Sequence, residues 1–310
     1  MKLSIVTTLY NSAAHLDEFH RRASVVAAHH AADSYELVLV NDGSPDESLE
    51  RAVALSGSDP HVVVVDLSRN FGHHKAMMTG LAHACGERVY LLDSDLEEEP
   101  EWFDAFLARL EEEEGCDVVY GVQRSRKGGR FERWSGRLFY RLMNAISGFD
   151  MPADMVTARL MTRRYVDALL RHEERELDIG GLWVITGFAQ RACLVDKHDT
   201  SATTYSLRRR IALVVNSVTS FSSVPLVATF YIGLVIFTIA ALFAAGVVLQ
   251  WALLDRPVSG WASLIISVWM IGAMIISFIG ILGIYLAKMF SEVKQRPYTI
   301  VREVHGRGSR

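Results

Sequence analysis

The sequence has little cysteine and no Pro- or Gly-rich linker between domains. Among 310 residues there are only three cysteines, Cys85, Cys116 and Cys193. They stand far apart and lack the paired spacing of a zinc site or a disulfide framework, so we expect three reduced thiols. No internal repeat, low-complexity segment or Pro- or Gly-rich linker interrupts the chain, which excludes a repeat architecture.

An excess of charge of either sign is also missing. The formal net charge is -4, and no basic stripe of the kind that a phosphate backbone requires runs along the chain, so nucleic acid is not an expected partner. Charge is absent altogether from residues 211–254 and 257–287. Each stretch exceeds the roughly 20 apolar residues that span a bilayer. The sequence therefore predicts two transmembrane helices.

Basic residues flank these two stretches. They are Arg208, Arg209, Arg210, Lys288, Lys294 and Arg296. Between the stretches, only Asp255 and Arg256 are charged. Because cationic flanks stay on the cytoplasmic side, we expect a multi-pass protein of the inner (plasma) membrane with both termini in the cytoplasm.

The residues up to Tyr205 have the mixed composition of a soluble domain. Short β-branched runs alternate there with amphipathic stretches, a pattern typical of a parallel sheet covered by helices. We expect strands at Leu3–Thr8, Glu36–Val40, Val62–Asp66, Val89–Asp93 and Asp117–Gly121. A helix should begin near Pro100, because proline is favoured at the first helical position. The expected fold class is α/β with a mainly parallel central sheet.

Two acidic motifs follow expected strands, where open parallel sheets bind ligands. The first is Asn41-Asp42-Gly43-Ser44. Asp42 could accept hydrogen bonds from a base or ribose, and Gly43 permits a tight turn. The alternative is a plain turn, since all four residue types favour turns.

The second motif, Asp93-Ser94-Asp95, follows an apolar strand. Carboxylates two apart in an extended segment point to the same side, and Mg²⁺ prefers oxygen ligands supplemented by substrate phosphates. The alternative is an acidic turn that runs on into Glu97–Glu99. Two carboxylates at one strand end would repel each other unless a cation lay between them, so we favour a metal-nucleotide site.

Basic and aromatic residues gather after Gly121, among them Arg124, Arg126 and Arg137. This pattern suits an amphipathic helix on anionic headgroups, and a solvated helix with core aromatics explains it equally well. The apolar stretches downstream favour the membrane surface. His73 and His74 are adjacent, so they point to different sides of a helix and are not expected to share a ligand.

An ordered set of motifs runs through nearly the whole chain. Its members are Thr8-Leu9-Tyr10-Asn11, Asn41–Ser44, Leu67-Ser68-Arg69-Asn70-Phe71-Gly72, Asp93-Ser94-Asp95-Leu96 with Pro100-Glu101, Arg159-Leu160-Met161, Phe221-Ser222 before Pro225-Leu226, and Arg296-Pro297-Tyr298. With this set, the chain resembles glycosyltransferase family 2, specifically its polyprenyl-phosphate branch. The set is specific, whereas no single member is.

The resemblance implies a nucleotide-sugar-binding α/β domain followed by two transmembrane helices. It implies a donor site formed by Thr8, Tyr10, Asn11, Asp42 and Asp93, a Mg²⁺ or Mn²⁺ ion on Asp93 and Asp95, catalytic roles for Asp95, Arg69 and Arg159, and an acceptor-phosphate site of Arg124, Arg126 and Arg137. The implied organisation is a catalytic domain (1–205), an interfacial amphipathic helix (206–223), two transmembrane helices (224–254 and 261–287) and a basic cytoplasmic tail (288–310).

The chain departs from the family pattern at several positions. The usual proline is Thr8, the usual glutamate is Ser12, and Gln123 stands where an arginine is common. Thr157 replaces an acidic residue that is regarded as a candidate base, although Asp154 is nearby. A phosphate acceptor, with a second pKa of about 6, is largely ionised near neutral pH and needs little help from a base.

The resemblance implies transfer of a sugar from a UDP-, GDP- or dTDP-sugar to a polyisoprenyl (undecaprenyl or dolichyl) phosphate at the cytoplasmic membrane face. Such a product would serve synthesis of a cell-surface glycan or glycolipid. One alternative is extension of a lipid-linked or polysaccharide sugar at a hydroxyl. Another is a catalytically silent membrane scaffold, against which the intact Asp93 and Asp95 argue. Assembly into a homo-oligomer is left open by the sequence.

Overall fold

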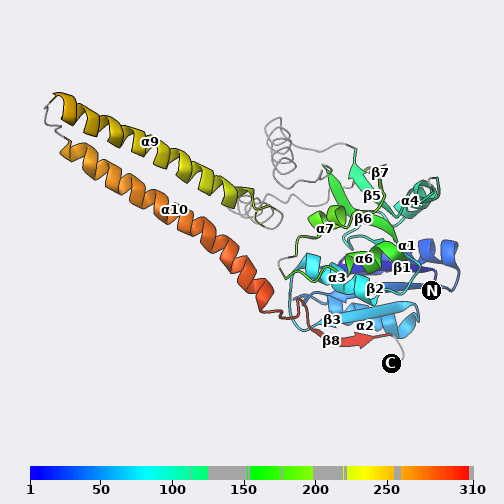
Figure 1. Cartoon of the computed structure of the whole chain (residues 1–310). Coiled ribbons are helices and arrows are strands. Elements are labelled where there is room, and N and C mark those ends of the chain that lie inside the picture. The colour runs from blue at the N-terminus through cyan, green and yellow to red at the C-terminus, as the bar shows by residue number, and fades with distance from the viewer. Residues whose placement is uncertain are drawn as a thin grey trace. The chain divides into compact units, whose positions relative to one another are not determined.

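The computed structural model describes residues 1–112, 114–124, 152, 154–175, 177–197, 219, 222–254 and 260–306. They form two compact units (Figure 1). One contains an eight-stranded sheet with its covering helices, and the other contains two long apolar helices. The first unit also includes residues that follow the apolar helices.

The first unit alternates strands and helices through its first half. Its elements are β1 (Leu3–Leu9), α1 (Leu16–Ala31), β2 (Tyr35–Asn41), α2 (Ser48–Ser58), β3 (Val62–Leu67), α3 (His73–His83), β4 (Arg88–Leu91), α4 (Trp102–Glu111), β5 (Val118–Gln123), β6 (Met155–Thr162), α6 (Arg163–Leu169), α7 (Ile179–Ile185), β7 (Gln190–Val195) and β8 (Val301–His305). The five expected strands are therefore present, and three more strands, β6, β7 and β8, were not predicted.

The sheet has the strand order β7-β5-β6-β4-β1-β2-β3-β8. Strands β4, β1, β2 and β3 are parallel neighbours, and β5 pairs in parallel with β7. Strand β6 runs antiparallel to both β4 and β5, and β8 runs antiparallel to β3. The α/β class with a mostly parallel sheet is confirmed, although the sheet is mixed rather than parallel throughout.

Strand β4 is shorter than the expected Val89–Asp93. Its ladder with β1 ends at the pair Val6–Leu91, and the Leu92 amide then donates to the Val6 carbonyl at 3.1 Å. Leu96 has a left-handed φ of 61°, so the chain turns soon afterwards. Asp93 consequently lies just beyond the strand instead of within it.

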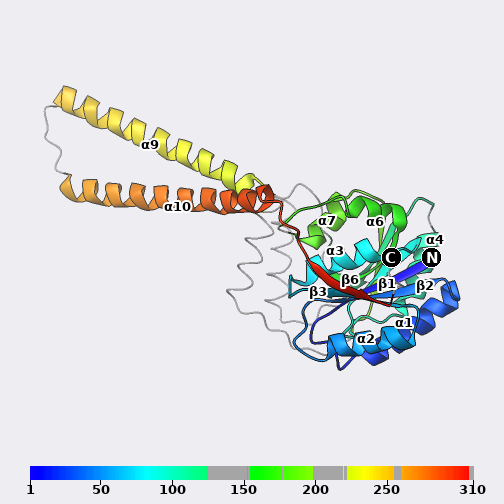
Figure 2. The ribbon, with the colours of Figure 1, turned by 90° about the horizontal axis from the view of Figure 1, so that it is seen from below.

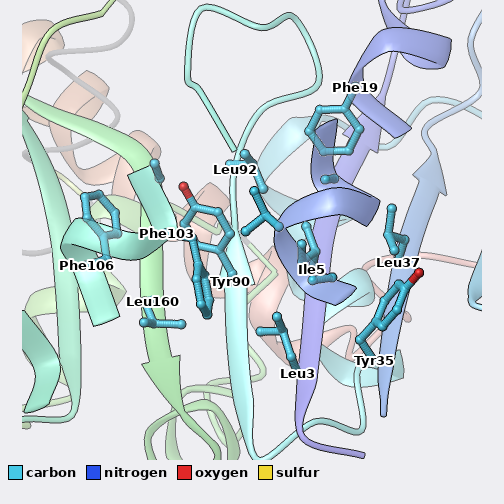
Figure 3. Close-up of a cluster of buried hydrophobic side chains, with 14 of the residues drawn as sticks. Leu3, Ile5, Phe19, Tyr35, Leu37, Tyr90, Leu92, Phe103, Phe106 and Leu160 are labelled. Atoms are coloured by element: carbon cyan, nitrogen blue, oxygen red, sulfur yellow. The ribbon is translucent and has the colours of Figure 1, made fainter. Parts of the chain in front are cut away.

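Apolar side chains bury both faces of the sheet, as is usual for parallel strands covered by helices. Alternate residues of β1 point to opposite faces: Leu3 and Ile5 join a cluster with α1, α2 and α4, and Val6 joins a cluster with α3, α6 and α7. Figure 2 shows α1 and α2 on one face and α3, α6 and α7 on the other. In the first cluster Phe19 and Phe103 pack over the strands (Figure 3).

The second unit contains α9 (Val224–Leu254) and α10 (Trp261–Val293). Its large apolar side chains are exposed, as in Phe237 at 70% and Trp269 at 77%, which suits contact with lipid. Within the described residues, one helix, Ser267–Val293, is long and apolar enough to cross a membrane, and Val224–Ala240 is a shorter apolar helix. The two predicted spans are therefore not both established.

The expected basic tail, 288–310, does not form a single tail. Helix α10 continues through its first residues to Val293, and Val301–His305 forms β8, which pairs with β3 in the sheet of the first unit. The sequence pattern missed this strand because its partner, β3, lies more than two hundred residues earlier in the chain.

Gly80 of α3 is packed so tightly on the sheet that a methyl group should not fit. A Cβ there would lie 2.6 Å from Val6 Cγ1 and 2.8 Å from Val40 Cγ2. We expect Gly80→Ala to destabilise the protein by about 1–3 kcal/mol through overpacking. Gly57→Ala in α2, where nothing lies within 4 Å, is the matched control and should leave stability unchanged or raise it. Thermal unfolding of the purified protein in detergent checks both, and equal midpoints would contradict the packing argument.

Candidate active site

The carboxyl ends of β4, β1, β2 and β3 meet at one edge of the sheet because these strands are parallel. The chain runs from β1 through β2 to β3 on one side and then places β4 on the other side of β1. Ligands bind at such a topological switch point in open α/β sheets. The candidate site therefore consists of the ends of these strands and the segments that follow them, residues 8–13, 41–48, 68–72 and 93–98.

The segments after β1 and β2 are joined by side chains that accept hydrogen bonds from main-chain amides. Ser44 Oγ accepts from the Asn11 amide at 2.8 Å, and Asp46 Oδ2 accepts from the Ala13 amide at 3.1 Å. Asp46 also accepts from the hydroxyls of Ser44 and Ser48. Burial raises the pKa of Asp46, but these hydrogen bonds outweigh it and lower the pKa to about 2. Asp46 is an organising carboxylate that the sequence analysis missed.

Three residues expected at the donor site lie in different surroundings. Tyr10 is 51% exposed, and Asn11 is exposed with a left-handed φ of 54°, so both side chains are open to a ligand. Thr8 is buried: its hydroxyl lies 3.0 Å from His73 Nδ1, and its carbonyl accepts from Ser94 Oγ at 3.0 Å. Thr8 therefore links β1 to α3 and to the segment after β4.

Asp42 is buried at 3% exposure, and its carboxylate binds the backbone of the 68–72 loop. Oδ1 accepts from the Phe71 amide at 2.7 Å and Oδ2 accepts from the Gly72 amide at 3.0 Å. Burial raises the pKa of Asp42, and the two amides partly offset this. The geometry favours an organising role for Asp42 over direct contact with a nucleoside.

Gly43 packs directly against the 68–72 loop. Its φ is +59°, and a Cβ at this position would meet the Asn70 nitrogen and, at 2.6 Å, the Arg69 carbonyl carbon. Any other residue would push the loop away. Arg69 itself is exposed, donates from Nη1 to the Asn70 carbonyl at 3.0 Å, and lies 4.1 Å from the centre of the Phe71 ring. Its guanidinium is therefore exposed beside the candidate site, and the role that the resemblance implies for it stays a prediction.

Asp93 contacts His73 at the switch point between β1 and β4. Its Oδ1 lies 3.3 Å from His73 Nε2, yet this buried oxygen has no hydrogen bond of good geometry. Burial raises the pKa of Asp93, but His73 and the Thr157 hydroxyl outweigh it and lower the pKa. Conversely, Asp93 raises the pKa of His73 against the opposing effect of burial. The sequence analysis did not foresee this role of His73; its position directly after the 68–72 loop was the signal.

Asp95 lies close to other carboxylates, and their charges affect its pKa. Burial raises its pKa, and the negative charges of Asp93 and Glu97 raise it further, while the Glu97 amide donates to Oδ1 at 3.0 Å. Among the described residues, no group of three or more His, Cys, Asp or Glu side chains could hold a metal ion by itself. Mg²⁺ needs only one or two carboxylates when substrate phosphates complete its shell. The unsatisfied Asp93 oxygen and the mutual repulsion therefore fit a divalent cation bound together with a diphosphate.

Glu98 is fully buried beneath these two aspartates. Its Oε1 accepts from the Thr157 amide at 2.9 Å, and Lys197 Nζ lies 3.9 Å from Oε1 and 3.2 Å from Glu97 Oε2. Burial, followed by the charge of Asp93, raises the pKa of Glu98 to about 8. In the sequence, Glu98 was considered only within the acidic run Glu97–Glu99, under the alternative of a plain acidic turn, and no role was predicted for it.

Arg159 is fully buried, so its position favours support of the site over contact with a substrate. Its guanidinium stacks 2.9 Å from the centre of the Trp183 ring, and Nε donates to the Thr157 carbonyl at 3.2 Å. Burial lowers its pKa to about 9. Arg159 thereby fixes the backbone of Thr157, the residue that replaces the family's acid and contacts both Asp93 and Glu98.

Of the residues expected to bind the acceptor phosphate, only Arg124 is described. It follows β5, its side chain is 63% exposed, and its Nε lies 3.9 Å from Asp196 Oδ1. Arg126 and Arg137 lie outside the described residues. Asp154 has a left-handed φ of 61°, and its carbonyl accepts from the Gln123 amide at 3.1 Å.

Comparison with known proteins agrees with this architecture. Residues 4–170 match the model of the family described as Glycosyl transferase family 2. The chain belongs to glycosyltransferase family 2. The α/β fold that the resemblance implied is therefore confirmed. A protein of Mycobacterium tuberculosis (strain CDC 1551 / Oshkosh) named as a glycosyltransferase is 47% identical over 99% of this chain and 89% of its own length.

Relatives of the polyprenyl-phosphate type are also found, which confirms the resemblance to that branch. The prophage bactoprenol glucosyl transferase homolog of Escherichia coli (strain K12) is 31% identical over 98% of this chain and 99% of its own length. The SfII prophage-derived bactoprenol glucosyl transferase of Shigella flexneri is 30% identical over the same shares. Among solved structures, glucosyl-3-phosphoglycerate synthase from Mycobacterium tuberculosis, with Mn²⁺, uridine diphosphate and phosphoglyceric acid, is 20% identical with a TM-score of 0.49 over 70% of this chain and 76% of that chain.

Asp46 should contribute to stability only while it is ionised. The pKa of Asp46 is depressed to about 2 from a model-compound value of 3.8, so its contribution is full above about pH 5 and is lost as the pH falls toward 2. We expect Asp46→Asn to destabilise the protein by about 1–2 kcal/mol at neutral pH, because the Ala13 amide and two hydroxyls lose a charged acceptor. Thermal unfolding between pH 7 and pH 3 should show the gap from wild type narrowing on acidification, and a constant gap would contradict this role.

Proposed function

We propose that the protein transfers a sugar from a nucleotide-sugar to a polyprenyl phosphate at the cytoplasmic face of a membrane, with the help of a divalent cation. The observation that carries the proposal is the pair Asp93 and Asp95 at the switch point of the sheet, where one buried oxygen lacks a hydrogen bond and the two charges repel. Relatives named bactoprenol glucosyl transferases, aligned over nearly the full chain, support the lipid acceptor.

The donor would bind along the segments after β1, β2 and β3. Tyr10 and Asn11 are exposed there and would contact the nucleoside, and Arg69 would lie near the diphosphate as a fixed positive charge. Asp42 would act indirectly, because it holds the Phe71 and Gly72 amides that shape the loop around the donor.

Asp93 and Asp95 would hold Mg²⁺ or Mn²⁺ against the donor diphosphate. When bound, the cation neutralises the negative charge that develops on the leaving nucleoside diphosphate. His73 would keep Asp93 oriented, since it lies 3.3 Å from Asp93 Oδ1 and is itself fixed by Thr8. Asp95 would contribute most directly to catalysis, because protein groups compensate its negative charge less than they compensate that of Asp93.

The reaction breaks the bond between the anomeric carbon of the sugar and the diphosphate oxygen, and forms a bond from that carbon to an acceptor phosphate oxygen. A phosphate monoester with a second pKa of about 6 attacks as an anion, so no side chain has to remove a proton. This fits Thr157 at the position of the family's acid, because a threonine hydroxyl does not act as a base at neutral pH.

The acceptor would arrive from the membrane. Exposed apolar side chains along α9 and α10 support two membrane-spanning helices, with the cationic flanks and both termini in the cytoplasm. Arg124, Arg126 and Arg137 would bind the lipid phosphate, a task for which the planar, permanently charged guanidinium is well suited.

The purified full-length chain should make a lipid-linked sugar from undecaprenyl phosphate and one of a set of UDP-, GDP- and dTDP-sugars. Undecaprenol, which lacks the phosphate, is the matched control and should give no product because it offers neither the anionic nucleophile nor a ligand for the arginines. Thin-layer chromatography with mass spectrometry measures the product. Transfer to undecaprenol or to a free sugar hydroxyl, but not to the phosphate, would contradict the proposal.

Replacing Asp95 should weaken metal binding and leave the protein folded. We expect Asp95→Asn to lower turnover by about 10²-fold or more, because the amide keeps the shape and removes a charge from the cation site. Asp167→Asn in α6, where the carboxylate is 59% exposed, is the control and should behave as wild type. Mn²⁺ binding, followed by electron paramagnetic resonance with nucleoside diphosphate present, should weaken only in Asp95→Asn. Unchanged Mn²⁺ binding in that variant would remove Asp95 from the metal site.

A further inference from the structure

Strand β8 returns from the end of α10 to the outer edge of the sheet and pairs antiparallel with β3 (Figure 2). The register shifts between Asp66 and Leu67, at the end of β3 that leads into the site. Just before β8, the hydroxyls of Thr299 and Thr79 lie 2.8 Å apart, which ties this segment to α3. Covering the open edge of β3 explains the strand pairing, but it does not explain the contacts made by the first residues of β8.

Both main-chain groups of Ser68 are held by this C-terminal segment. The Ser68 amide donates to the Ile300 carbonyl at 2.9 Å, and Arg302 Nη2 donates to the Ser68 carbonyl at 2.7 Å. Ser68 opens the 68–72 loop, which carries the exposed Arg69. The entry to this loop is therefore fixed by residues that belong to the other end of the chain.

Arg302 also compensates a buried charge beside the loop. Its Nη1 lies 3.3 Å from Asp66 Oδ2, and the Asp66 side chain is only 4% exposed. Asp66 Oδ1 accepts from Asn41 Nδ2 at 2.8 Å, and Asn41 Oδ1 accepts from the Ser44 amide at 3.2 Å. A continuous set of polar contacts thus runs from Arg302 through Asp66 to the turn after β2.

The far end of the 68–72 loop is bound to the same turn. Asp42 accepts the amides of Phe71 and Gly72, and the turn at Gly43 packs against the backbone of Arg69 and Asn70. Arg302 therefore acts on the loop by two routes: it bonds the loop at Ser68, and through Asp66 it supports the turn that the loop packs against.

We propose that Arg302 is a positioning residue for the donor nucleotide: it holds the 68–72 loop and the turn after β2 in the arrangement that receives the nucleotide. The assignment rests on the proposed function, because it takes that loop and turn as the donor site. Strand pairing itself uses main-chain atoms of β8, so loss of the Arg302 side chain should leave the sheet intact while loosening the loop.

The test compares Arg302→Ala, Arg302→Lys and Arg51→Ala. Arg51 in α2 is the matched control. Like Arg302 it is half-exposed and forms ion pairs, but its partners, Asp17 and Glu47, are exposed carboxylates. For Arg302→Ala we expect KM for the nucleotide-sugar, and Kd for its nucleoside diphosphate with Mn²⁺ by calorimetry, to rise about tenfold, with kcat and KM for undecaprenyl phosphate changed less than about twofold. Arg302→Lys should be intermediate, because an ammonium can serve Asp66 or Ser68 but lacks the fork that reaches both.

Hydrogen exchange supplies a readout that needs no ligand. Peptides covering residues 67–72 should exchange faster in Arg302→Ala than in wild type or Arg51→Ala, because the Ser68, Phe71 and Gly72 amides lose support. Unchanged exchange and unchanged nucleotide affinity would overturn the assignment. Equal losses in kcat and in both KM values, with a lower unfolding midpoint and no rescue by lysine, would show a merely structural role and would also overturn it. If wild type binds none of UDP, GDP or dTDP with Mn²⁺, the proposed function fails, and the exchange data alone then decide whether Arg302 orders the loop.

Discussion

The candidate-site edge of the sheet depends on carboxylates that accept hydrogen bonds from main-chain amides of segments distant in sequence. Asp42 binds the 68–72 loop, Asp46 binds the segment after β1, and Glu98 binds the start of β6 at Thr157. Because a main-chain N–H group shielded from water needs an acceptor, each of these acids fixes the position of a segment. Asp93 differs from them, since one of its buried oxygens keeps unused capacity for a ligand.

The fold was predictable where pattern and pairing are local. The β-branched runs gave the first three strands to within one residue at each end, because parallel strands buried on both faces are nearly continuous in apolar residues. Strand β8 was not predicted, because its antiparallel partner lies far away in the chain and its exposed positions carry charged residues such as Arg302 and Glu303. Hydrophobic periodicity detects burial, but it carries no information about which edge a short strand will join.

The location of the candidate site was predictable, but the roles of its individual residues were not. The strand-end motifs predicted Asp93 and Asp95 at one edge of the sheet, and the family resemblance implied Tyr10, Asn11 and Arg69 at the same site. The structure has all five residues in segments that follow the parallel strands β1, β3 and β4. The difference between a ligand-facing acid and an organising acid was not visible, because both occur in turn-like sequences rich in Asp, Ser and Gly. It depends on three-dimensional partners, such as the two amides that occupy Asp42 and the tryptophan that encloses Arg159.

The order of the elements along the chain has a consequence for biogenesis. Ribosomes deliver β3 and the 68–72 loop first, then the apolar helices α9 and α10, and only afterwards β8. Until β8 emerges, the edge of β3 remains open, the buried Asp66 lacks its cation, and both main-chain groups of Ser68 lack their partners, the Ile300 carbonyl and the Arg302 side chain. The contacts of the 68–72 loop are therefore completed only after α9 and α10 have been synthesised, so a nascent chain that ends within these helices would hold an unfinished loop.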